Sequence, residues 1–170
     1  WFEVIHKMGY DWYKDLIHVP FGLVSLDSGK LSTRHGNVVL MEDLLHQAIA
    51  ETKKIIEEKN PSLPDKEEVA KKVGIGAVIF NDLYNTRIKD VVFSWERMLN
   101  FDGETGPYVQ YTHARACSIL KKAPDFTAEN IDFSKLDDEA SLNVCKLLEA
   151  FPSKIVDAAA KLEPYVLTRH

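Results

Sequence analysis

The chain has 170 residues, of which 45% are hydrophobic and 28% are charged, and its formal net charge at pH 7 is −5. This composition is ordinary for a globular protein, and the length suffices for one domain or two small ones. The acidic balance argues against a protein whose whole surface binds nucleic acid, so any RNA contact has to be a local patch. No stretch reads as a membrane span or a signal peptide, and we expect a cytoplasmic protein.

The cysteines and the two ends of the sequence add to this picture. Cys117 and Cys145 fall in segments that we expect to be helical, with no C-x-x-C pair and no cluster of metal ligands. We therefore expect reduced thiols in the core of a cytosolic protein, and no metal site. Residues 1–5 begin within an uncapped helical pattern and residues 164–170 open a new apolar element, so we expect a piece of a longer protein.

The first segment of the chain predicts a helix followed by a strand. Residues 2–8 carry apolar side chains at every third position, which is typical of a helix, and Gly9 follows as a C-terminal stop. The nearly continuous apolar run over 16–26 predicts a strand buried on both faces, as in a parallel α/β sheet. Since the rest of the chain mostly predicts helices, we expect the neighbours of this strand to lie upstream.

A polar stretch, GKLSTRHGN over residues 29–37, follows this strand. Its two glycines allow the backbone to approach a ligand closely, and Lys30, Ser32, Thr33 and the backbone amides can donate hydrogen bonds to phosphate oxygens. This is the composition of an anion-binding loop, although an ordinary solvated turn can share it. The P-loop spacing G-x-x-x-x-G-K-[ST] is absent.

Helices are predicted for most of the remaining chain. A helix over 42–59 has an inward stripe formed by Leu45, Ala48, Ile49, Thr52, Ile55 and Ile56. Residues 60–64 break it. Asp65 is expected to cap a helix through Lys72, and a second, very apolar helix is expected from Gly74 to Tyr84, with its glycines allowing close helix packing.

The C-terminal half predicts a helical bundle. Residues 89–95 are extended in pattern, a helix is expected over 107–122, a polar connector over 124–136, and a helix over 137–150 before another that begins at Pro152. The inward-facing side chains that we expect are Val109, Thr112, Ala116 and Ile119 on the first helix, and Leu142, Cys145, Leu147 and Leu148 on the next.

One face of the helix over 107–122 combines aromatic and cationic side chains. Tyr108, Tyr111, Arg115 and Lys122 fall together at offsets of three, four and seven residues. Such a face can stack on bases and pair with phosphates. An interdomain packing face with half-buried tyrosines is an equally good interpretation.

The polar stretch and much of the following sequence resemble one enzyme family. Residues 30–34 resemble the second signature of class I aminoacyl-tRNA synthetases, KMSKS, and the run to Val39 is similar to the arginyl form, K-M-S-T-R-x-G-N-V-V. Residues 74–77, 82–83, 89–111 and 114–115 also look like the arginyl-tRNA synthetase pattern at many positions. The likeness covers nearly the whole chain up to about Leu120, and is looser beyond it.

The resemblance implies a mainly α fold class. Residues 1–60 would be the end of a Rossmann-type α/β catalytic domain with its KMSKS-like loop, residues 61–100 a helical connector, and residues 101–170 the start of an α-helical anticodon-binding bundle. The implied activity is an ATP-dependent ligase, using ATP with Mg²⁺, that activates L-arginine and transfers it to tRNA. We expect a cytoplasmic monomer that does not bind membranes.

The resemblance also implies roles for particular residues. The catalytic residues would be Lys30, Ser32, Thr33 and Arg34, acting on the departing pyrophosphate. The nucleotide would contact Lys30 and, on its adenine side, chiefly backbone groups of His18, Val19, Phe21 and Gly22. The tRNA would contact Tyr108, Gln110, Tyr111 and Arg115.

Two positions depart from the family pattern. Leu31 replaces the methionine of KMSKS, a swap of similar size, and Thr33 replaces its second lysine. The family is thought to compensate with a lysine near its first signature, H-I-G-H, which this sequence lacks together with the arginine-binding side chains, so we expect the fragment alone to be inactive. Two alternatives are a non-catalytic helical RNA-binding or interaction module derived from a synthetase, and a cysteinyl-like synthetase, against which residues 103–111 argue.

Overall fold

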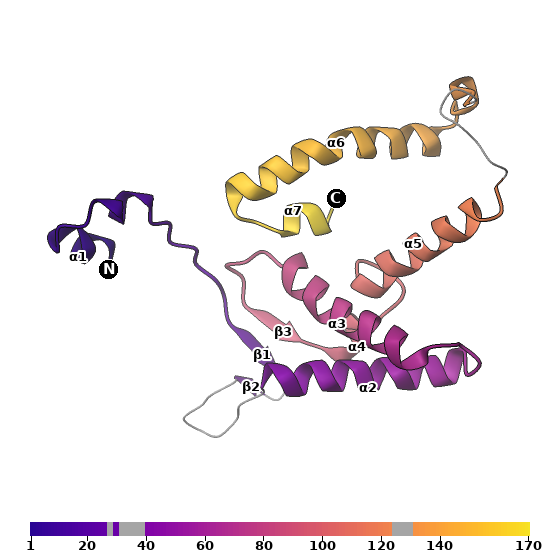
Figure 1. Ribbon diagram of the computed structural model, residues 1–170, viewed down its shortest axis with the longest axis horizontal. Helices are drawn as coiled ribbons and strands as arrows, with labels where there is room; N and C mark the ends of the chain where they lie inside the picture. Colours follow the sequence, from indigo (N-terminus) through magenta and orange to yellow (C-terminus); the bar gives the residue numbers. More distant parts are fainter. Residues whose placement is uncertain (27–28, 31–39, 124–130) are drawn as a thin grey trace.

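The computed structural model describes residues 1–26, 29–30, 40–123 and 131–170, and it is mainly helical, as predicted (Figure 1). The helices are α1 (Phe2–Lys7), α2 (Met41–Lys59), α3 (Lys66–Tyr84), α4 (Trp95–Met98), α5 (Gly106–Leu120), α6 (Glu139–Lys161) and α7 (Tyr165–Thr168). The strands are β1 (Val24–Leu26), β2 (Gly29–Lys30) and β3 (Val91–Phe93), and two 3₁₀ turns cover Asp11–Asp15 and Phe133–Lys135.

The core lies between the helix pair α2 and α3 and also includes Phe93, Met98 and Leu99. The predicted inward stripe of α2 is confirmed, because Ala48, Thr52 and Ile56 are buried and the other stripe residues are half-buried. On α3, Gly74 faces the carbonyl oxygen of Ala48 so closely that a Cβ at residue 74 would lie 2.7 Å from that oxygen. Small residues thus allow the two helices to approach one another, as the sequence predicted.

Helix α3 runs without a break through Gly74, so the prediction of two separate helices was wrong. A glycine within a helix costs about 1 kcal/mol relative to alanine. Here the close packing on α2, with Ala70 and Ala77 fully buried on α3, offsets that cost. The expected cap was also wrong, because Asp65 adopts a left-handed conformation with φ 56° and its side chain makes no capping hydrogen bond.

A small sheet in the order β2-β1-β3 lies beside this helix pair. Strand β1 pairs with β2 in antiparallel fashion and with β3 in parallel fashion, with Val24 opposite Val91. A partner of β1 therefore comes from the downstream segment that the sequence marked as extended, and the expectation that its neighbours all lie upstream was wrong.

The prediction of a long strand over 16–26, buried on both faces, was also wrong. Only its last three residues form β1, and the side chains of Ile17, Phe21 and Leu23 are 71%, 81% and 61% exposed. The prediction took a continuous apolar run as evidence of two covered faces. In the described part of the chain, no element covers these side chains.

Helix α5 packs on α3 through its first turns. Gly106 and Pro107 are buried, and a Cβ at residue 106 would lie 2.9 Å from the carbonyl oxygen of Gly76. This close approach determines which face is buried, and the predicted stripe is not on it: Val109 and Ile119 are 50% and 66% exposed, and Thr112 and Ala116 are exposed as well.

Helix α6 continues through Pro152, so the predicted break was wrong here too. Its N-terminus is capped by Asp138, whose Oδ1 accepts from the backbone N–H of Ser141 at 2.9 Å. Leu142, Leu147 and Leu148 are exposed, contrary to expectation. The two cysteines are free, as expected, but Cys117 is half-buried and Cys145 is exposed, so neither is a core thiol.

The C-terminal end of α3 and helix α7 lie side by side (Figure 1). The last carbonyl groups of a helix lack intrahelical partners. In α3 the carbonyl of Leu83 accepts from the hydroxyl of Thr168 at 3.3 Å, and that of Tyr84 accepts from Nε of Arg169 at 3.2 Å. Residues from the far end of the sequence therefore cap α3 and attach the C-terminal helices to it.

Candidate functional site

The polar stretch expected to bind phosphate begins in the small sheet. The backbone of Lys30 lies opposite Ser25, because Gly29 and Lys30 form strand β2 rather than the start of a loop. Ser32, Thr33 and Arg34 lie outside the described residues, so their predicted roles stay predictions. The pairing of β2 with β1 nevertheless places the start of this stretch next to the strand that follows residues 18–22.

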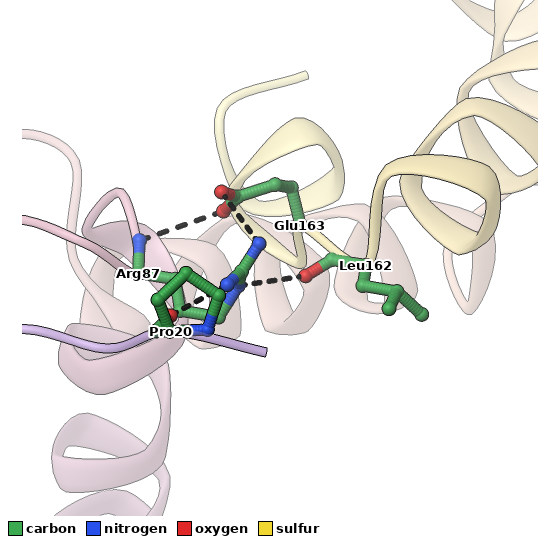
Figure 2. A network of polar contacts seen from close by, with 4 residues as sticks. All are labelled: Pro20, Arg87, Leu162 and Glu163. Atoms are coloured by element: carbon green, nitrogen blue, oxygen red, sulfur yellow. Dashed lines mark hydrogen bonds and ion pairs between the residues drawn. The ribbon is translucent and has the colours of Figure 1, made fainter. Parts of the chain in front are cut away.

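The residues expected on the adenine side form an extended segment that leads into β1. His18, Val19 and Phe21 are exposed, whereas Gly22 is half-buried. The N–H of Gly22 donates to the carbonyl of Arg87 at 2.8 Å. Figure 2 shows that the carbonyl of Pro20 accepts from the guanidinium of the same residue. These two backbone groups therefore hold the segment in place, and the exposed neighbours remain available to a ligand.

Residue 22 has to be a glycine, because the backbone of residues 89–90 approaches it closely. A Cβ at residue 22 would overlap the carbonyl of Lys89 and lie 2.8 Å from the amide nitrogen of Asp90. The next residue is held too, because the N–H of Leu23 donates to Oδ1 of Asp90 at 2.7 Å. The end of the segment, at residues 22 and 23, thus has a fixed path along the turn that precedes β3, whereas these contacts do not include residues 18–20.

Two hollows flank this segment. One, with a volume of about 320 Å³, lies between residues 21–24 and the turn that follows α3, and Arg87 and Lys89 contribute to its wall. The other is an apolar groove of about 440 Å³ between the start of α2, the middle of α3 and the small sheet. The wall of the first carries both signs of charge, from Asp82, Arg87 and Lys89, beside apolar residues, whereas the second is lined mostly by apolar side chains.

The aromatic and cationic face on α5 is present in part. Tyr108 and Tyr111 are 45% and 50% exposed, and Arg115 lies one turn further along. The guanidinium carbon of Arg115 is 5.6 Å from the centroid of the Tyr111 ring, and its Nη1 lies 3.5 Å from the Tyr111 hydroxyl. Lys122 lies in the turn that follows α5, which ends at Leu120.

Gln110 is directed elsewhere. Its Nε2 donates to the carbonyl of Lys72 at 3.2 Å and lies 2.6 Å from the position that a Cβ of residue 76 would occupy. Its Oε1 is buried and has no hydrogen-bond partner among the described residues. The structure therefore gives Gln110 a packing contact with α3 and separates it from the two tyrosines, and its expected contact with tRNA stays a prediction.

Two further features complete the description of the site. The phenol of Tyr84 donates to the carboxylate of Glu104, and this hydrogen bond raises the pKa of Tyr84 above its ordinary value. Among the described residues, His, Cys, Asp and Glu side chains form no group of three or more that could hold a metal ion. No described helix is long and apolar enough to cross a membrane.

Comparison with family models divides the chain into two parts. Residues 1–95 match the model described as tRNA synthetases class I (R), catalytic domain, and residues 109–170 match the DALR anticodon binding domain. The first match covers more than half of the chain. The predicted site residues near 18–34 fall in the first match, and those on α5, apart from Tyr108, fall in the second.

Individual relatives agree with these matches. The chain is 56% identical over 170 residues to an arginine–tRNA ligase of Halothermothrix orenii and 56% identical over 169 residues to that of Clostridioides difficile. It spans about 30% of the length of each. Among solved structures, the Thermus thermophilus arginyl-tRNA synthetase superposes with a TM-score of 0.84 at 34% identity, covering 99% of this chain and 28% of that one. The Plasmodium falciparum enzyme, at 24% identity and a TM-score of 0.72, shares the fold.

Sequence reasoning missed Arg87, which joins the segment of residues 18–22 to residues 162–163. A single arginine in a turn between a helix and a short strand carries no motif. Its partners are 67 to 76 positions away, so no local pattern could have identified them.

Proposed function

Because the chain belongs to the arginyl-tRNA synthetase family of class I synthetases, we propose that it is part of an ATP-dependent arginine–tRNA ligase. The observation that carries the proposal is the order of the two family matches. A class I catalytic-domain match over residues 1–95 precedes an anticodon-binding match over residues 109–170 in one chain. The high identity over the whole chain supports the same conclusion.

The proposed reaction has two steps. The carboxylate of L-arginine attacks the α-phosphate of ATP, which forms arginyl adenylate and releases pyrophosphate. Mg²⁺ would accompany ATP as its counterion. A hydroxyl of the terminal ribose of the tRNA then attacks the activated carbonyl carbon, and AMP leaves. Negative charge increases on the pyrophosphate during the first step, so cations held near it lower the barrier.

We assign that role to Lys30, assisted by Ser32, Thr33 and Arg34. The pairing of β2 with β1 supports the assignment, because it links the start of this stretch to the segment of His18, Val19, Phe21 and Gly22 that would contact the adenine side. ATP then spans from the extended segment to the cationic stretch.

For tRNA, the proposed contacts are on α5. The exposed rings of Tyr108 and Tyr111 offer stacking surfaces, and Arg115 adds a cation beside one of them. We retain the division into a catalytic end (1–60), a helical connector (61–100) and the anticodon-binding helices (101–170) as part of the proposal. From the family we also propose that the enzyme acts in the cytoplasm as a monomer.

The test is arginine-dependent exchange of pyrophosphate into ATP by a full-length enzyme that contains this chain, with tRNA present. Exchange with arginine, and not with cysteine or lysine at the same concentration, is the expected result. A protein that binds tRNA but exchanges with no amino acid would show that the chain belongs to a non-catalytic RNA-binding module.

A further inference from the structure

Arg87 lies in the turn between α3 and β3 and contacts two distant segments at once (Figure 2). Its Nη1 donates to the carbonyl of Pro20 at 2.5 Å, and its Nε donates to the carbonyl of Leu162 at 3.2 Å. Its Nη2 lies 3.3 Å from Oε1 of Glu163, and its own N–H donates to Oε2 of the same carboxylate at 3.5 Å. With the bond from Gly22 to its carbonyl, Arg87 uses both its side chain and its main chain.

The pair formed by Arg87 and Glu163 is shielded from water. Their side chains are only 21% and 13% exposed, unlike those of the other ion pairs in the described residues. A planar guanidinium can serve several acceptors in fixed directions, which a lysine ammonium cannot do in the same way. Removing it would leave a largely buried carboxylate without its cation, and the exposed carbonyls of Pro20 and Leu162 would be left to water.

The acceptors of Arg87 at the C-terminal side are held rigidly. Leu162 adopts the left-handed conformation, with φ 54°, which is uncommon for a leucine. The N–H of Glu163 donates to the carbonyl of Ala158 at 3.0 Å, and that of Leu162 donates to the carbonyl of Ala159 at 3.2 Å. These bonds close the end of α6, so the corner between α6 and α7 presents a fixed carbonyl and a fixed carboxylate to Arg87.

The other acceptor belongs to the proposed nucleotide side. Pro20 lies within the segment that contains His18, Val19, Phe21 and Gly22, and this segment has few contacts of its own, as the exposure of its side chains indicates. Arg87 therefore connects a sparsely packed segment in the catalytic-domain match to a rigid corner in the anticodon-domain match.

We propose that Arg87 is a positioning residue for ATP, and that Glu163 and Leu162, although they belong to the C-terminal helices, complete the nucleotide site by anchoring Arg87. Without the anchor, the segment around residue 20 would still join β1 but would no longer be held at one place beside the hollow. This inference rests on the proposed function. It makes the corner between α6 and α7 a determinant of ATP binding.

The experiment compares ATP dependence in the full-length enzyme, measured by pyrophosphate exchange at saturating arginine and tRNA. Arg87→Ala is expected to raise the KM for ATP by about tenfold or more with a smaller effect on the KM for arginine, since a misplacement of about 1 Å can cost a factor of about 100. Glu163→Gln keeps the shape of the side chain and should raise the KM for ATP less, but in the same direction. The KM for ATP of Arg87→Lys should lie between that of Arg87→Ala and that of the wild type.

Two matched arginine variants separate positioning from a general loss of packing. Arg169→Ala removes another contact between the C-terminal helices and α3, but Arg169 does not reach the segment around residue 20. Arg97→Ala removes a bond from an arginine to a main-chain carbonyl, that of Val92, close to the same sheet. Both should keep the wild-type KM for ATP even where the melting temperature falls.

The outcomes are distinct from those that test the function itself. A wild-type enzyme without arginine-dependent exchange would reject the proposed function and this inference with it. Exchange by the wild type, together with a wild-type KM for ATP in both Arg87→Ala and Glu163→Gln, would overturn the positioning role alone. So would an Arg169→Ala enzyme whose KM for ATP rises as much as theirs. If Arg87→Ala does not fold, the KM values for ATP of Glu163→Gln and Arg87→Lys decide whether Arg87 has the positioning role.

Discussion

Arg169 caps the main chain at Tyr84 and lies over the ring of the same residue. Its Nε donates to the carbonyl oxygen of Tyr84 at 3.2 Å, and its guanidinium carbon is 4.7 Å from the centroid of that ring and 5.1 Å from the centroid of Tyr165. One side chain thus satisfies the end of α3 and bridges an aromatic side chain of α3 and one of α7. The contact attaches the C-terminal helices to the core.

Loss of this contact should lower stability measurably. Arg169→Ala removes a hydrogen bond and two cation–π contacts at an exposed site, and we expect the free energy of unfolding to fall by about 1 to 2 kcal/mol. Urea unfolding followed by circular dichroism measures it. Arg169→Lys keeps the charge but loses the flat stacking and should recover only part of the loss. An unchanged midpoint in Arg169→Ala would show that α7 is held by its other contacts.

Gly74 and Gly76 should respond differently to the same substitution. Gly74→Ala gains helix propensity but places a methyl group 2.7 Å from the carbonyl oxygen of Ala48, and the backbone there cannot yield without separating α2 from α3. We expect the free energy of unfolding to fall by about 1 to 3 kcal/mol, which is typical of overpacking. Gly76→Ala meets the end of the flexible Gln110 side chain instead, and should cost less. Urea unfolding of both variants tests the order, and the reverse order would contradict the packing described for α2 and α3.

The sequence predicted those features that depend on neighbouring residues alone. The inward stripe of α2 and the stop at Gly9, whose φ is 85°, follow from local periodicity and backbone freedom, and both are confirmed. The continuity of α3 through Gly74 and of α6 through Pro152 was not predictable in this way. The continuity of α3 depends on close packing against a partner helix, α2. The continuity of α6 depends on the exposure of that helix, because the carbonyl that Pro152 leaves without a donor can face water.

The same distinction applies to the candidate site. The family signature around Lys30 and the tyrosines of α5 were visible in the sequence, because motifs and helical offsets are local. The buried face of α5 was assigned wrongly because the close approach of Gly106 to Gly76, and not hydrophobicity, selects that face. Arg87 was missed because its partners come from distant parts of the chain.

Tyr84 provides a test by pH. Its hydrogen bond to the Glu104 carboxylate raises its pKa in the folded protein above the value of about 10 in the unfolded chain. The bond therefore contributes fully to stability below pH 10 and is lost as the pH rises through the higher pKa of the folded state. We expect Tyr84→Phe, which keeps the ring under Arg169, to melt below the wild type at pH 8. The difference should shrink toward pH 11, and parallel melting curves across this range would exclude the bond as a source of stability.

Substitutions on the exposed face of α5 distinguish RNA binding from packing. In the full-length enzyme, Tyr111→Ala should weaken tRNA binding by about 1 to 3 kcal/mol if the ring stacks on a base. Arg115→Ala should reduce the slope of log affinity against log salt by about 1 if the guanidinium pairs with a phosphate. Tyr10→Ala is a matched control, because that ring is 49% exposed and lies outside α5. Unchanged affinity with a lower melting temperature would favour the packing interpretation.

Lys30 is the residue on which the proposed chemistry depends most. If its ammonium stabilises the departing pyrophosphate, Lys30→Ala in the full-length enzyme should slow pyrophosphate exchange by about 100-fold or more, which is typical for the loss of one preorganised charge-stabilising group. The melting temperature should change little, because strand β2 consists of only two residues. Lys71→Ala is a suitable control, since Lys71 is an exposed lysine on α3 that is not part of the proposed site. Stopped-flow or steady-state exchange kinetics measure the effect. A Lys30→Ala enzyme with the wild-type exchange rate would remove this lysine from the mechanism, and would leave the phosphates to be held by other groups of the same stretch.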